Sequence, residues 1–414
     1  MITEKKIALI NAGKYNPENI DEYLRLGGYK NVEKALQKSP ADIIELMIDA
    51  KLRGRGGAGF PTGLKEKFTN EAVCNRCIQK YIICNADEGE PGTYKDRIIM
   101  EQDPHVLIEG MIISAYAIGA TKGYIYVRGE YTESIKMLRV ALEQAKTKGF
   151  LGKNILNSGF DLDIEINLGA GSYLCGEELT LLESLEGKRG YPRIKPPFPA
   201  EKGLFGMPTL INNVETFAHL PYIIEHGAEH YKSMGTEKSP GTKIFTISGD
   251  VNKPGYYETT MGVTLRQLID DLAGGMKDNK KFKAAILGGA AGTFVNETVL
   301  DTPMGFDTLK EKGAVLGSGA IIVMSEDRSI FDMTWSILEF FKHESCGKCV
   351  PCRVGTVQLM LFMEKAKENP SEKKEILEQL LYEADFMAKN SLCPLGQSPI
   401  LPIKSLKQFF QHQF

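Results

Sequence analysis

The chain has 414 residues, of which 43% are hydrophobic and 25% are charged, and its net charge at pH 7 is -3. This length suffices for two or three packed domains, and the composition argues against extended disorder. Nearly balanced charge and dispersed lysines give no electrostatic reason to expect nucleic acid as a partner. No window approaches the apolar length of a membrane span, so we expect no direct membrane insertion and a cytoplasmic location.

The first predicted elements are short helices within residues 17–52. The segment SPADIIELMIDAKL has Ser39 placed as an N-cap, Pro40 in the first turn and apolar residues at helical spacing. From residue 80 to residue 190, apolar strands such as YIIC, YIYVRG and DLDIEINLG alternate with longer helical segments. This alternation predicts a parallel sheet with helices on its faces.

The pattern changes after the proline-rich segment YPRIKPPFPA. The strands KIFTISGDV and PGYYETT, the helix TLRQLIDDLAGG and strands near AAILGG and AIIVMS predict a small α+β domain. From Ser329 onward, long amphipathic stretches predict a helical bundle. The expected fold is therefore α/β, then α+β, then all-α, with domains at residues 1–240, 241–328 and 329–414.

The first motif with chemical meaning is Gly54-Arg55-Gly56-Gly57-Ala58-Gly59, which matches GxGxxG. A standard dinucleotide fingerprint requires a preceding strand and an acidic residue about twenty positions later, whereas here a helix precedes the loop and Gln79 occupies that position. Four glycines in six positions still let backbone N–H groups approach a phosphate or a planar ring, and Phe60 and Lys65 follow. We predict a phosphate- or flavin-binding loop; the alternative is a plain flexible loop.

Two further candidate loops follow strands of the predicted sheet. CNADEGEPG comes directly after the strand YIIC, and GAGSYLCGEE ends the third strand. Ligands of open α/β sheets bind at such carboxyl ends, where carboxylates accept hydrogen bonds from ribose hydroxyls and repel the extra phosphate of NADP. The alternatives are an acidic turn in solvent for the first loop and helix-dipole partners for Glu177 and Glu178 in the second.

Asn212, Asn213 and Thr216, in PTLINNVET, supply neutral donors and acceptors that suit a flavin ring or a phosphate. A capped helix start explains these residues almost as well. The six histidines form no site and no nucleophile motif is nearby, so a hydrolytic function has little support.

Near the C-terminus, Cys346, Cys349 and Cys352 are each separated by two residues, and Cys393 follows later. Three such thiolates can bind three irons of a cuboidal [4Fe-4S] cluster and leave the fourth iron for a ligand brought in by folding. The alternatives are a four-cysteine zinc site and unrelated buried thiols. Eight cysteines in a chain of this size favour a reducing compartment over a disulfide framework.

Six motifs together, GRGGAGFPTGLK, CNADEGEPGTYKDR, GAGSYLCGEE, KPPFPA, NNVET and SCGKCVPCRVG, resemble the NADH-binding flavoprotein subunit of respiratory complex I over nearly the whole chain. The resemblance implies a Rossmann-like FMN/NADH domain, a β-grasp (SLBB) domain and a helical bundle with one [4Fe-4S] cluster. It implies NADH dehydrogenase activity, in which NADH delivers a hydride to FMN and single electrons pass to the cluster. The implied partners are a small thioredoxin-like [2Fe-2S] subunit and further iron–sulfur subunits, which would place the chain peripherally at the inner membrane face.

The resemblance also assigns residues to the cofactors. FMN would be held by Gly54, Arg55, Gly56, Gly57, Lys65, Asn85, Asp87, Gly176, Asn212, Asn213 and Thr216. The rings of Phe60, Phe68 and Phe198 would contact NADH, Glu90 and Tyr173 would lie near the nicotinamide, and Glu88, Glu177 and Glu178 complete the cofactor-binding set. The cluster ligands would be Cys346, Cys349, Cys352 and Cys393. No acidic or basic side chain is expected to be indispensable, because the hydride chemistry belongs to the cofactors.

Two features depart from the family pattern. Glu66 follows Lys65 where the family usually has a tryptophan, and an additional pair, Cys74 and Cys77, precedes Cys84. We interpret the pair as inert thiols rather than as a metal site with Cys84, because no fourth ligand is evident.

Two rival functions remain. One is the diaphorase subunit of a soluble NAD-linked or electron-bifurcating hydrogenase or formate dehydrogenase. The other is a scaffold protein that is stabilised by a bound metal and binds partners without catalysis. The motif DEGEPGT and the absence of added ferredoxin-like or thioredoxin-like segments favour the complex I type.

Overall fold

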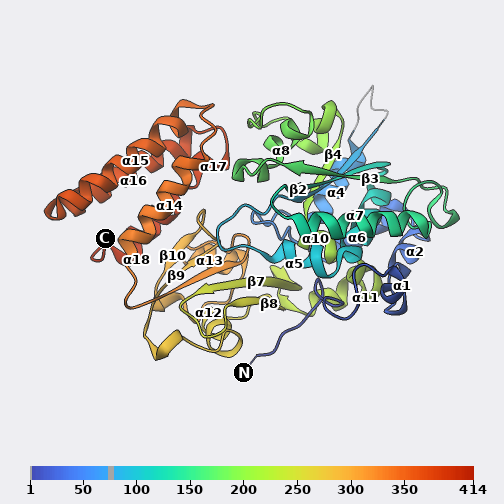
Figure 1. Cartoon of the computed structure of the whole chain (residues 1–414), viewed down its shortest axis with the longest axis horizontal. Coiled ribbons are helices and arrows are strands. Elements are labelled where there is room, and N and C mark those ends of the chain that lie inside the picture. The colour runs from blue at the N-terminus through green and yellow to red at the C-terminus, as the bar shows by residue number, and fades with distance from the viewer. Residues whose placement is uncertain (1, 73–78) are drawn as a thin grey trace.

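The computed structural model describes residues 2–72 and 79–414, and its helices and strands form three packed parts (Figure 1). The first part contains a sheet of four parallel strands in the order β3-β2-β1-β4. Its strands are β1 (Tyr81–Ala86), β2 (Lys122–Arg128), β3 (Asp163–Gly169) and β4 (Thr209–Asn213). The predicted parallel sheet is confirmed. The prediction missed β4, because its five residues carry polar asparagines at the end and run directly into a helix.

Helices cover both faces of this sheet, because its strands bury side chains on both sides. Ile82 and Cys84 of β1 pack into the larger core, with α6 and the N-terminal helices, while Ile83 packs into a smaller core with α8. The helices of this part are α1 (Ile20–Arg25), α2 (Lys30–Leu36), α3 (Pro40–Asp49), α4 (Thr62–Glu71), α5 (Lys95–Gln102), α6 (Pro104–Ile118), α7 (Thr132–Thr147), α8 (Glu178–Leu185), α9 (Pro199–Lys202), α10 (Val214–Ala218) and α11 (Leu220–Lys232). At the start of α3, Ser39 accepts a hydrogen bond from the Asp42 amide, as its N-cap position predicts.

The second part is a five-stranded mixed sheet in the order β10-β9-β11-β7-β8. The strands are β7 (Thr242–Gly249), β8 (Gly255–Thr260), β9 (Phe282–Leu287), β10 (Thr293–Val295) and β11 (Ala320–Ser325). Strand β11 pairs in parallel with β7, and the other neighbours are antiparallel. Short helices, including α12 (Leu265–Gln267) and α13 (Phe306–Glu311), accompany the sheet. The α+β prediction is confirmed, although the three-residue β10 was not predicted.

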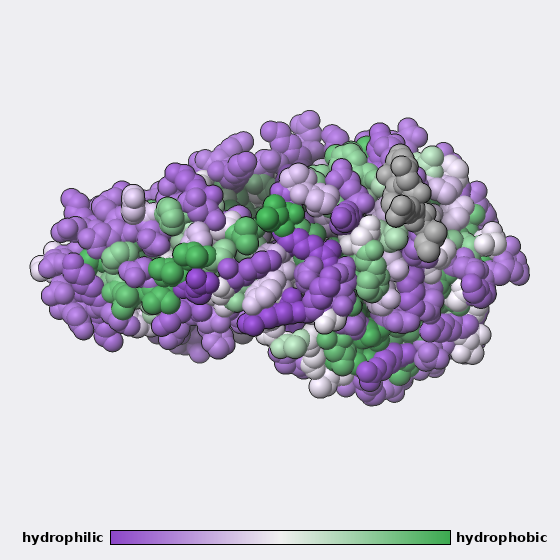
Figure 2. Space-filling view, turned by 90° about the horizontal axis from the view of Figure 1, so that it is seen from above, coloured by the Kyte–Doolittle hydropathy of each residue, from purple (hydrophilic) through white to green (hydrophobic). Residues whose placement is uncertain are grey.

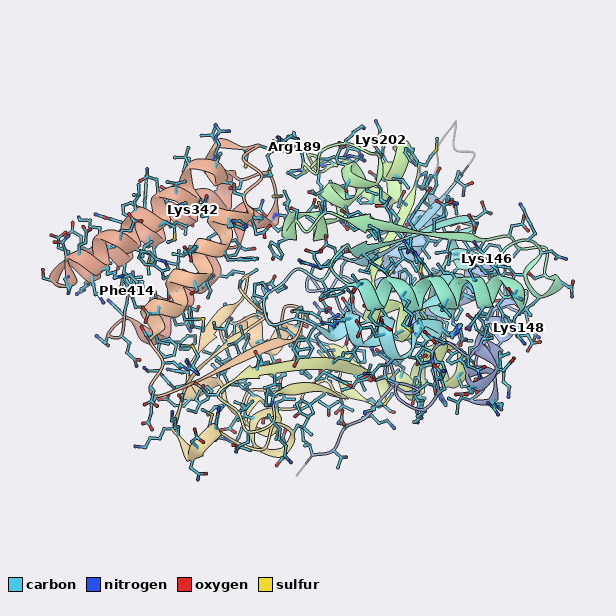
Figure 3. The ribbon with its side chains drawn as sticks, in the orientation of Figure 1. Lys146, Lys148, Arg189, Lys202, Lys342 and Phe414 are labelled. Atoms are coloured by element: carbon cyan, nitrogen blue, oxygen red, sulfur yellow. The ribbon has the colours of Figure 1, made fainter. Side chains whose placement is uncertain are left out.

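The third part is the predicted helical bundle, which forms one end of the molecule (Figure 1). It consists of α14 (Ile330–Glu344), α15 (Val350–Glu368), α16 (Lys373–Asn390), α17 (Pro394–Gln397) and α18 (Ile400–Phe410). Buried Leu338, Leu359, Met363, Leu380 and Ile403 contribute to its core. The chain ends beside the first helix of this part: the ring of Phe414, labelled in Figure 3, lies 5.4 Å from that of Phe331. None of the described helices combines the length and apolar character that a membrane crossing requires.

Candidate functional site

A cavity of about 930 Å³ lies where the three parts of the chain meet. Its wall combines the glycine-rich loop before α4, the carboxyl ends of β1 and β4, loops of the second sheet, and residues of α17 and α18. This is the edge at which open α/β sheets bind ligands, and the volume suits a cofactor. Ten of the predicted residues line it: Gly56, Gly57, Asn85, Asp87, Glu88, Glu90, Tyr173, Gly176, Glu177 and Asn213.

The glycine-rich loop presents its backbone to the cavity, and the side chain of Arg55 points away from the cavity into the protein. A Cβ atom added at Gly56 would lie 3.0 Å from the Cβ of Asn213, so glycine permits this close approach. The Arg55 side chain is fully buried, and its guanidinium donates hydrogen bonds to the Tyr231 hydroxyl and the Pro240 carbonyl. The Arg55 amide donates to the Thr216 hydroxyl at 2.8 Å. Arg55 and Thr216 thus fix the shape of the loop and do not line the cavity.

A buried network of charges supports the carboxyl end of β4. Lys95 at the start of α5 donates to Asn213 Oδ1 at 3.0 Å, and its ammonium also lies 2.6 Å from Asp96 Oδ1 and 3.0 Å from Glu215 Oε2. Lys243 of β7 donates to the same Glu215 oxygen at 3.2 Å, which joins the second sheet to the first part. Burial would raise the pKa of Glu215, but the two ammonium groups lower it to about 2. Glu215 is therefore ionised at neutral pH.

Lys95 and Asp96 also line the cavity, although neither was among the residues predicted from the sequence. They belong to the motif CNADEGEPGTYKDR. A lysine–aspartate pair at a helix start directly after an acidic loop was the available signal. It was missed because charged residues at a helix start usually face solvent.

The acidic loop after β1 contains three carboxyl groups with different surroundings. Burial raises the pKa of Asp87 to about 7, against the opposing effect of the Arg128 guanidinium. Both oxygens of Glu88 accept backbone amides of α5, those of Asp96 and Arg97, so Glu88 caps this helix. Glu90 accepts the Tyr173 hydroxyl at 2.6 Å and the amide of Ala291, a residue of the second part, at 2.9 Å.

Two buried polar atoms near this edge match the chemistry of a flavin. Asp87 Oδ1 and Asn212 Nδ2 have no hydrogen-bond partner within the described ranges 2–72 and 79–414. An acceptor and a donor that are both unpaired fit a ring edge that carries both kinds of group, as that of isoalloxazine does. The glycine backbone beside Asn213 gives a flat ligand close access. The residues present therefore fit FMN.

The three rings predicted to contact NADH lie outside the lining of this cavity, whereas Glu90 and Tyr173, expected near the nicotinamide, are part of it. Phe60, Phe68 and Phe198 are 43%, 50% and 53% exposed. At the start of α8, the Glu178 carboxylate is 3.7 Å from the Lys65 ammonium and 2.7 Å from that of Lys195. Although burial opposes it, these two cations lower the pKa of Glu178. The three exposed rings are free to contact a ligand.

Glu177 has a structural role that the sequence left open. Its Oε2 atom accepts the amides of Leu179 and Thr180, so it caps α8 in the way that the helix-dipole alternative requires. Glu177 lines the cavity as well, so the two interpretations are compatible.

The four candidate cluster cysteines gather at helix ends of the bundle. Cys346 follows α14, Cys349 is the N-cap of α15, Cys352 lies in the first turn of α15, and Cys393 is the N-cap of α17. Burial raises the pKa of Cys352 to about 11 and that of Cys393 to about 12, although backbone N–H groups of Leu395 and Gly396 favour the Cys393 thiolate. A bound cation is therefore needed to keep both as thiolates at neutral pH.

These four thiols come from two separate segments that the bundle brings close to one another. In the part of the chain that the structure describes, no group of three or more His, Cys, Asp or Glu residues is arranged to hold one metal ion. A zinc ion draws its thiolates together at bonds of about 2.3 Å. A [4Fe-4S] cluster binds one thiolate at each of four separate irons, so its ligands stand further apart. Four free thiols supply the donor set that a [4Fe-4S] cluster requires, so the residues present fit the cluster. Cys74 and Cys77 lie outside the described residues, and Cys84 is buried in β1.

Comparison with known proteins supports these assignments. Family models match in chain order: the Nuo51 FMN-binding domain at residues 47–222, the SLBB domain at 244–292, and the NADH-ubiquinone oxidoreductase-F iron-sulfur binding region at 332–414. The NADH-quinone oxidoreductase F subunit of Aquifex aeolicus is 52% identical, with 95% of this chain and 90% of that protein covered. The chain belongs to the family of NADH-quinone oxidoreductase F subunits. The family member of Escherichia coli is 43% identical, with 96% of this chain and 89% of that protein covered.

Membership of this family confirms the predicted fold class, NADH dehydrogenase activity and cofactors, FMN and [4Fe-4S]. Hydrogenase subunits are also similar. The HndC subunit of the NADP-reducing hydrogenase of Solidesulfovibrio fructosivorans is 43% identical, with 100% of this chain and 84% of that protein covered. A crystal structure of an NAD+-reducing [NiFe]-hydrogenase in the H2-reduced state matches with a TM-score of 0.81 and 37% identity. That match covers 92% of this chain and 63% of the hydrogenase chain, so this chain spans less than two thirds of its length.

Proposed function

We propose that this chain is the electron-input subunit of a respiratory NADH:quinone oxidoreductase, with FMN in the central cavity and the cluster on Cys346, Cys349, Cys352 and Cys393. One observation carries the proposal: Pro394 and Leu395, which follow Cys393, line the same cavity as Gly56 and Asn213. The flavin-binding wall and the cluster-binding segment therefore share one space. The division into domains at residues 1–240, 241–328 and 329–414 belongs to the same proposal.

FMN supplies two-electron hydride uptake from NADH and one-electron release, and the side chains around it supply binding and orientation. The Gly56 and Gly57 backbone would bring N–H groups close to FMN, and Asp87 would offer an acceptor in the cavity wall. Asn212, at the end of β4 next to Asn213, would offer a donor. The Lys95 ammonium gives the cavity wall a fixed positive charge next to Asn213. Lys95 is held by Asn213, Asp96 and Glu215 before ligand binds, so little reorganisation of this group accompanies binding.

The exposed rings and the acidic helix start fit NADH as the substrate. Phe60, Phe68 and Phe198 offer ring faces for stacking, which favours a planar base. Glu178 is ionised and held between Lys65 and Lys195. A carboxylate at this position accepts hydrogen bonds from a ribose and repels a 2′-phosphate, which favours NADH over NADPH.

An exposed apolar surface on the bundle supports docking of an electron-accepting subunit, which we propose is the small thioredoxin-like [2Fe-2S] protein. Val354, Val357 and Leu361 of α15, with Tyr382 and Phe386 of α16, are between 40% and 77% exposed. Figure 2 shows hydrophobic side chains gathered on this end of the molecule. Contiguous exposed apolar side chains of this kind mark interaction surfaces. Through such partners the chain would be peripheral to the membrane.

The test is to load the purified protein with FMN and iron–sulfide and to follow both centres. NADH should bleach the flavin absorbance, and ferricyanide reduction should follow. A Cys349→Ser variant should keep flavin reduction and lose the electron paramagnetic resonance signal of the reduced cluster. Bound flavin that NADH fails to reduce would refute the assignment, and stoichiometric zinc without flavin would favour the scaffold alternative.

A second candidate is the diaphorase subunit of a soluble hydrogenase, because similarity to the hydrogenase protein HndC extends over the entire chain. Isolation of the native assembly from its source separates the two candidates. Quinone reduction by NADH supports the respiratory complex, whereas NAD+ reduction by H2 supports the hydrogenase.

A further inference from the structure

Tyr173, in the segment that follows β3, contacts residues of the first and third parts of the chain and is linked to the second part through Glu90. Its hydroxyl donates to Glu90 Oε2 at 2.6 Å, and the other oxygen of Glu90 accepts the amide of Ala291 in the second part. Its backbone amide donates to Glu344 Oε2 at 3.0 Å, and its ring meets that of Phe340 edge-on at 5.0 Å; both residues belong to α14. Tyr173 also lines the central cavity.

The contact with Glu344 leads directly to the cluster ligands. Glu344 is the last residue of α14, and Cys346 follows two positions later. Between them, the Ser345 hydroxyl lies 3.2 Å from the Cys352 sulfur. On the other side of the contact, Leu174 follows Tyr173 into the hydrophobic core of the bundle. A shift at the Glu344 carboxylate would therefore move the cluster segment relative to the cavity.

A second contact fixes the same segment beyond Cys346. The Lys348 ammonium donates to the Pro192 carbonyl at 2.8 Å and lies 5.4 Å from the centre of the Tyr191 ring. Figure 3 shows Arg189, two residues before Tyr191, on the edge of the first part that faces the bundle. Hydrogen bonds thus hold the cluster segment on both sides of Cys346. The one at Glu344 joins the segment to Tyr173 in the cavity wall.

We propose that Glu344 is a positioning residue, which binds the Tyr173 amide and thereby sets the separation between the flavin cavity and the cluster. The inference rests on the proposed function. FMN, when bound, would accept a hydride from NADH, which leaves as NAD+, and would pass one electron to the oxidised cluster and one to an external one-electron acceptor such as ferricyanide, with the protons released to water. A hydrogen bond from an amide to a carboxylate is stronger than one between neutral groups, so this contact contributes strongly to the position of the cluster segment.

The experiment compares Glu344→Ala, which removes the acceptor, with Glu344→Gln, which keeps an acceptor oxygen and removes the charge. In the FMN- and cluster-loaded protein, stopped-flow absorbance gives the rate of flavin reduction by NADH, and freeze-quench electron paramagnetic resonance gives the rate of cluster reduction. Glu344→Ala should lower the ratio of cluster rate to flavin rate severalfold, because the rate of electron transfer falls steeply as the separation of donor and acceptor grows. Glu344→Gln should restore most of this ratio.

Hydrogen exchange provides a readout that does not depend on turnover. The Tyr173 amide should exchange about tenfold faster in Glu344→Ala, because its acceptor is gone, and near the wild-type rate in Glu344→Gln. Glu339→Ala is the matched control, since it removes a carboxylate from an exposed position of the same helix. This control should change neither quantity.

Three results would overturn the inference: an unchanged rate ratio in Glu344→Ala, an equal loss in Glu344→Gln, or the same loss in Glu339→Ala. A wild-type protein that binds flavin but is not reduced by NADH would instead refute the proposed function. Should Glu344→Ala fail to fold, Phe340→Leu, which removes the ring contact to Tyr173, should lower the same ratio; an unchanged ratio there would contradict the proposal.

Discussion

Two groups of buried acidic side chains in the first part of the chain differ in how the free-energy cost of their burial is offset. Beside the cavity, Asp96 and Glu215 are paired with the ammonium groups of Lys95 and Lys243. Along α6, three carboxyl groups meet hydroxyls instead of cations: Glu66 with Ser114, Asp103 with Tyr15, and Glu109 with Tyr23. Each of these three has one oxygen without a partner among the described residues.

The difference appears in their protonation. Cations lower the pKa of Glu215 to about 2, against the effect of burial. Burial raises the pKa of Glu66 to about 7, that of Asp103 to about 8 and that of Glu109 to about 7. Glu215 therefore keeps its charge, while the three acids along α6 are neutral below pH 7. A carboxylate thus stays ionised where it shares two buried ammonium groups at the junction of the first and second parts, and the core along α6 avoids buried charge.

The largest expected effect is that of Glu215→Gln. This change leaves Lys95 and Lys243 buried without their shared carboxylate, so we expect a loss of about 3–5 kcal/mol in the free energy of unfolding. Urea denaturation of the apoprotein measures it, and FMN retention should fall in parallel. Glu229→Gln, at a 90% exposed side chain of α11, is the matched control and should change stability by less than about 0.5 kcal/mol. A similar small effect at Glu215 would remove the distinction between the two groups.

Glu66→Gln should have a smaller effect that depends on pH. The folded-state pKa of Glu66, about 7, lies above its ordinary value of 4.5, so its contribution to stability is full below pH 4.5 and is lost as the pH rises to 7. The variant lacks this loss. Its stability relative to wild type should therefore rise by about 3 kcal/mol between about pH 4 and about pH 8. Thermal unfolding across this range tests the prediction. Glu71→Gln, exposed on the same helix, should show no such change, and a flat difference for Glu66→Gln would show that folding does not raise the pKa of Glu66.

The smallest effect is expected for Ser114→Ala, which removes the hydroxyl that donates to Glu66 Oε1 at 2.5 Å. Loss of this hydrogen bond should cost about 1 kcal/mol, and more above pH 7, where Glu66 is ionised. Urea midpoints at low and high pH measure both values. In a Glu66→Gln background the pH-dependent component should vanish; its persistence would assign it to another group.

Most of the fold could be predicted from the sequence, because most elements carry strong local signals. Helix α3 has a capping box at Ser39, and the long helices of the bundle have continuous amphipathic patterns. The strands β4 and β10 were missed, because they have five and three residues and their pairing with β1 and β9 stabilises them. Short strands depend on partners that are distant in sequence, so local patterns do not reveal them.

The candidate site was predicted only in part, because some of its residues carry local sequence signals and others are placed by contacts between distant segments. Glycine-rich and acidic loops at strand ends are local signals, and they located Gly56, Asp87 and Asn213 at one cavity. The roles of Arg55 and Thr216 as supports behind the loop, and of Lys95 as part of the cavity wall, depend on contacts between distant segments.

The sequence by itself determined the chemistry of this protein: CxxC spacing defines thiolates for a cluster, and glycine at the loop before α4 defines a close approach of backbone to ligand. Only the tertiary structure decided which charges stay ionised and how the cluster segment is tied to the cavity. The sequence does not distinguish the carboxyl group of Glu66 from that of Glu215. Its protonation and its role follow from burial and from the cations or amides that folding brings within hydrogen-bond distance, as at Glu344 and Tyr173.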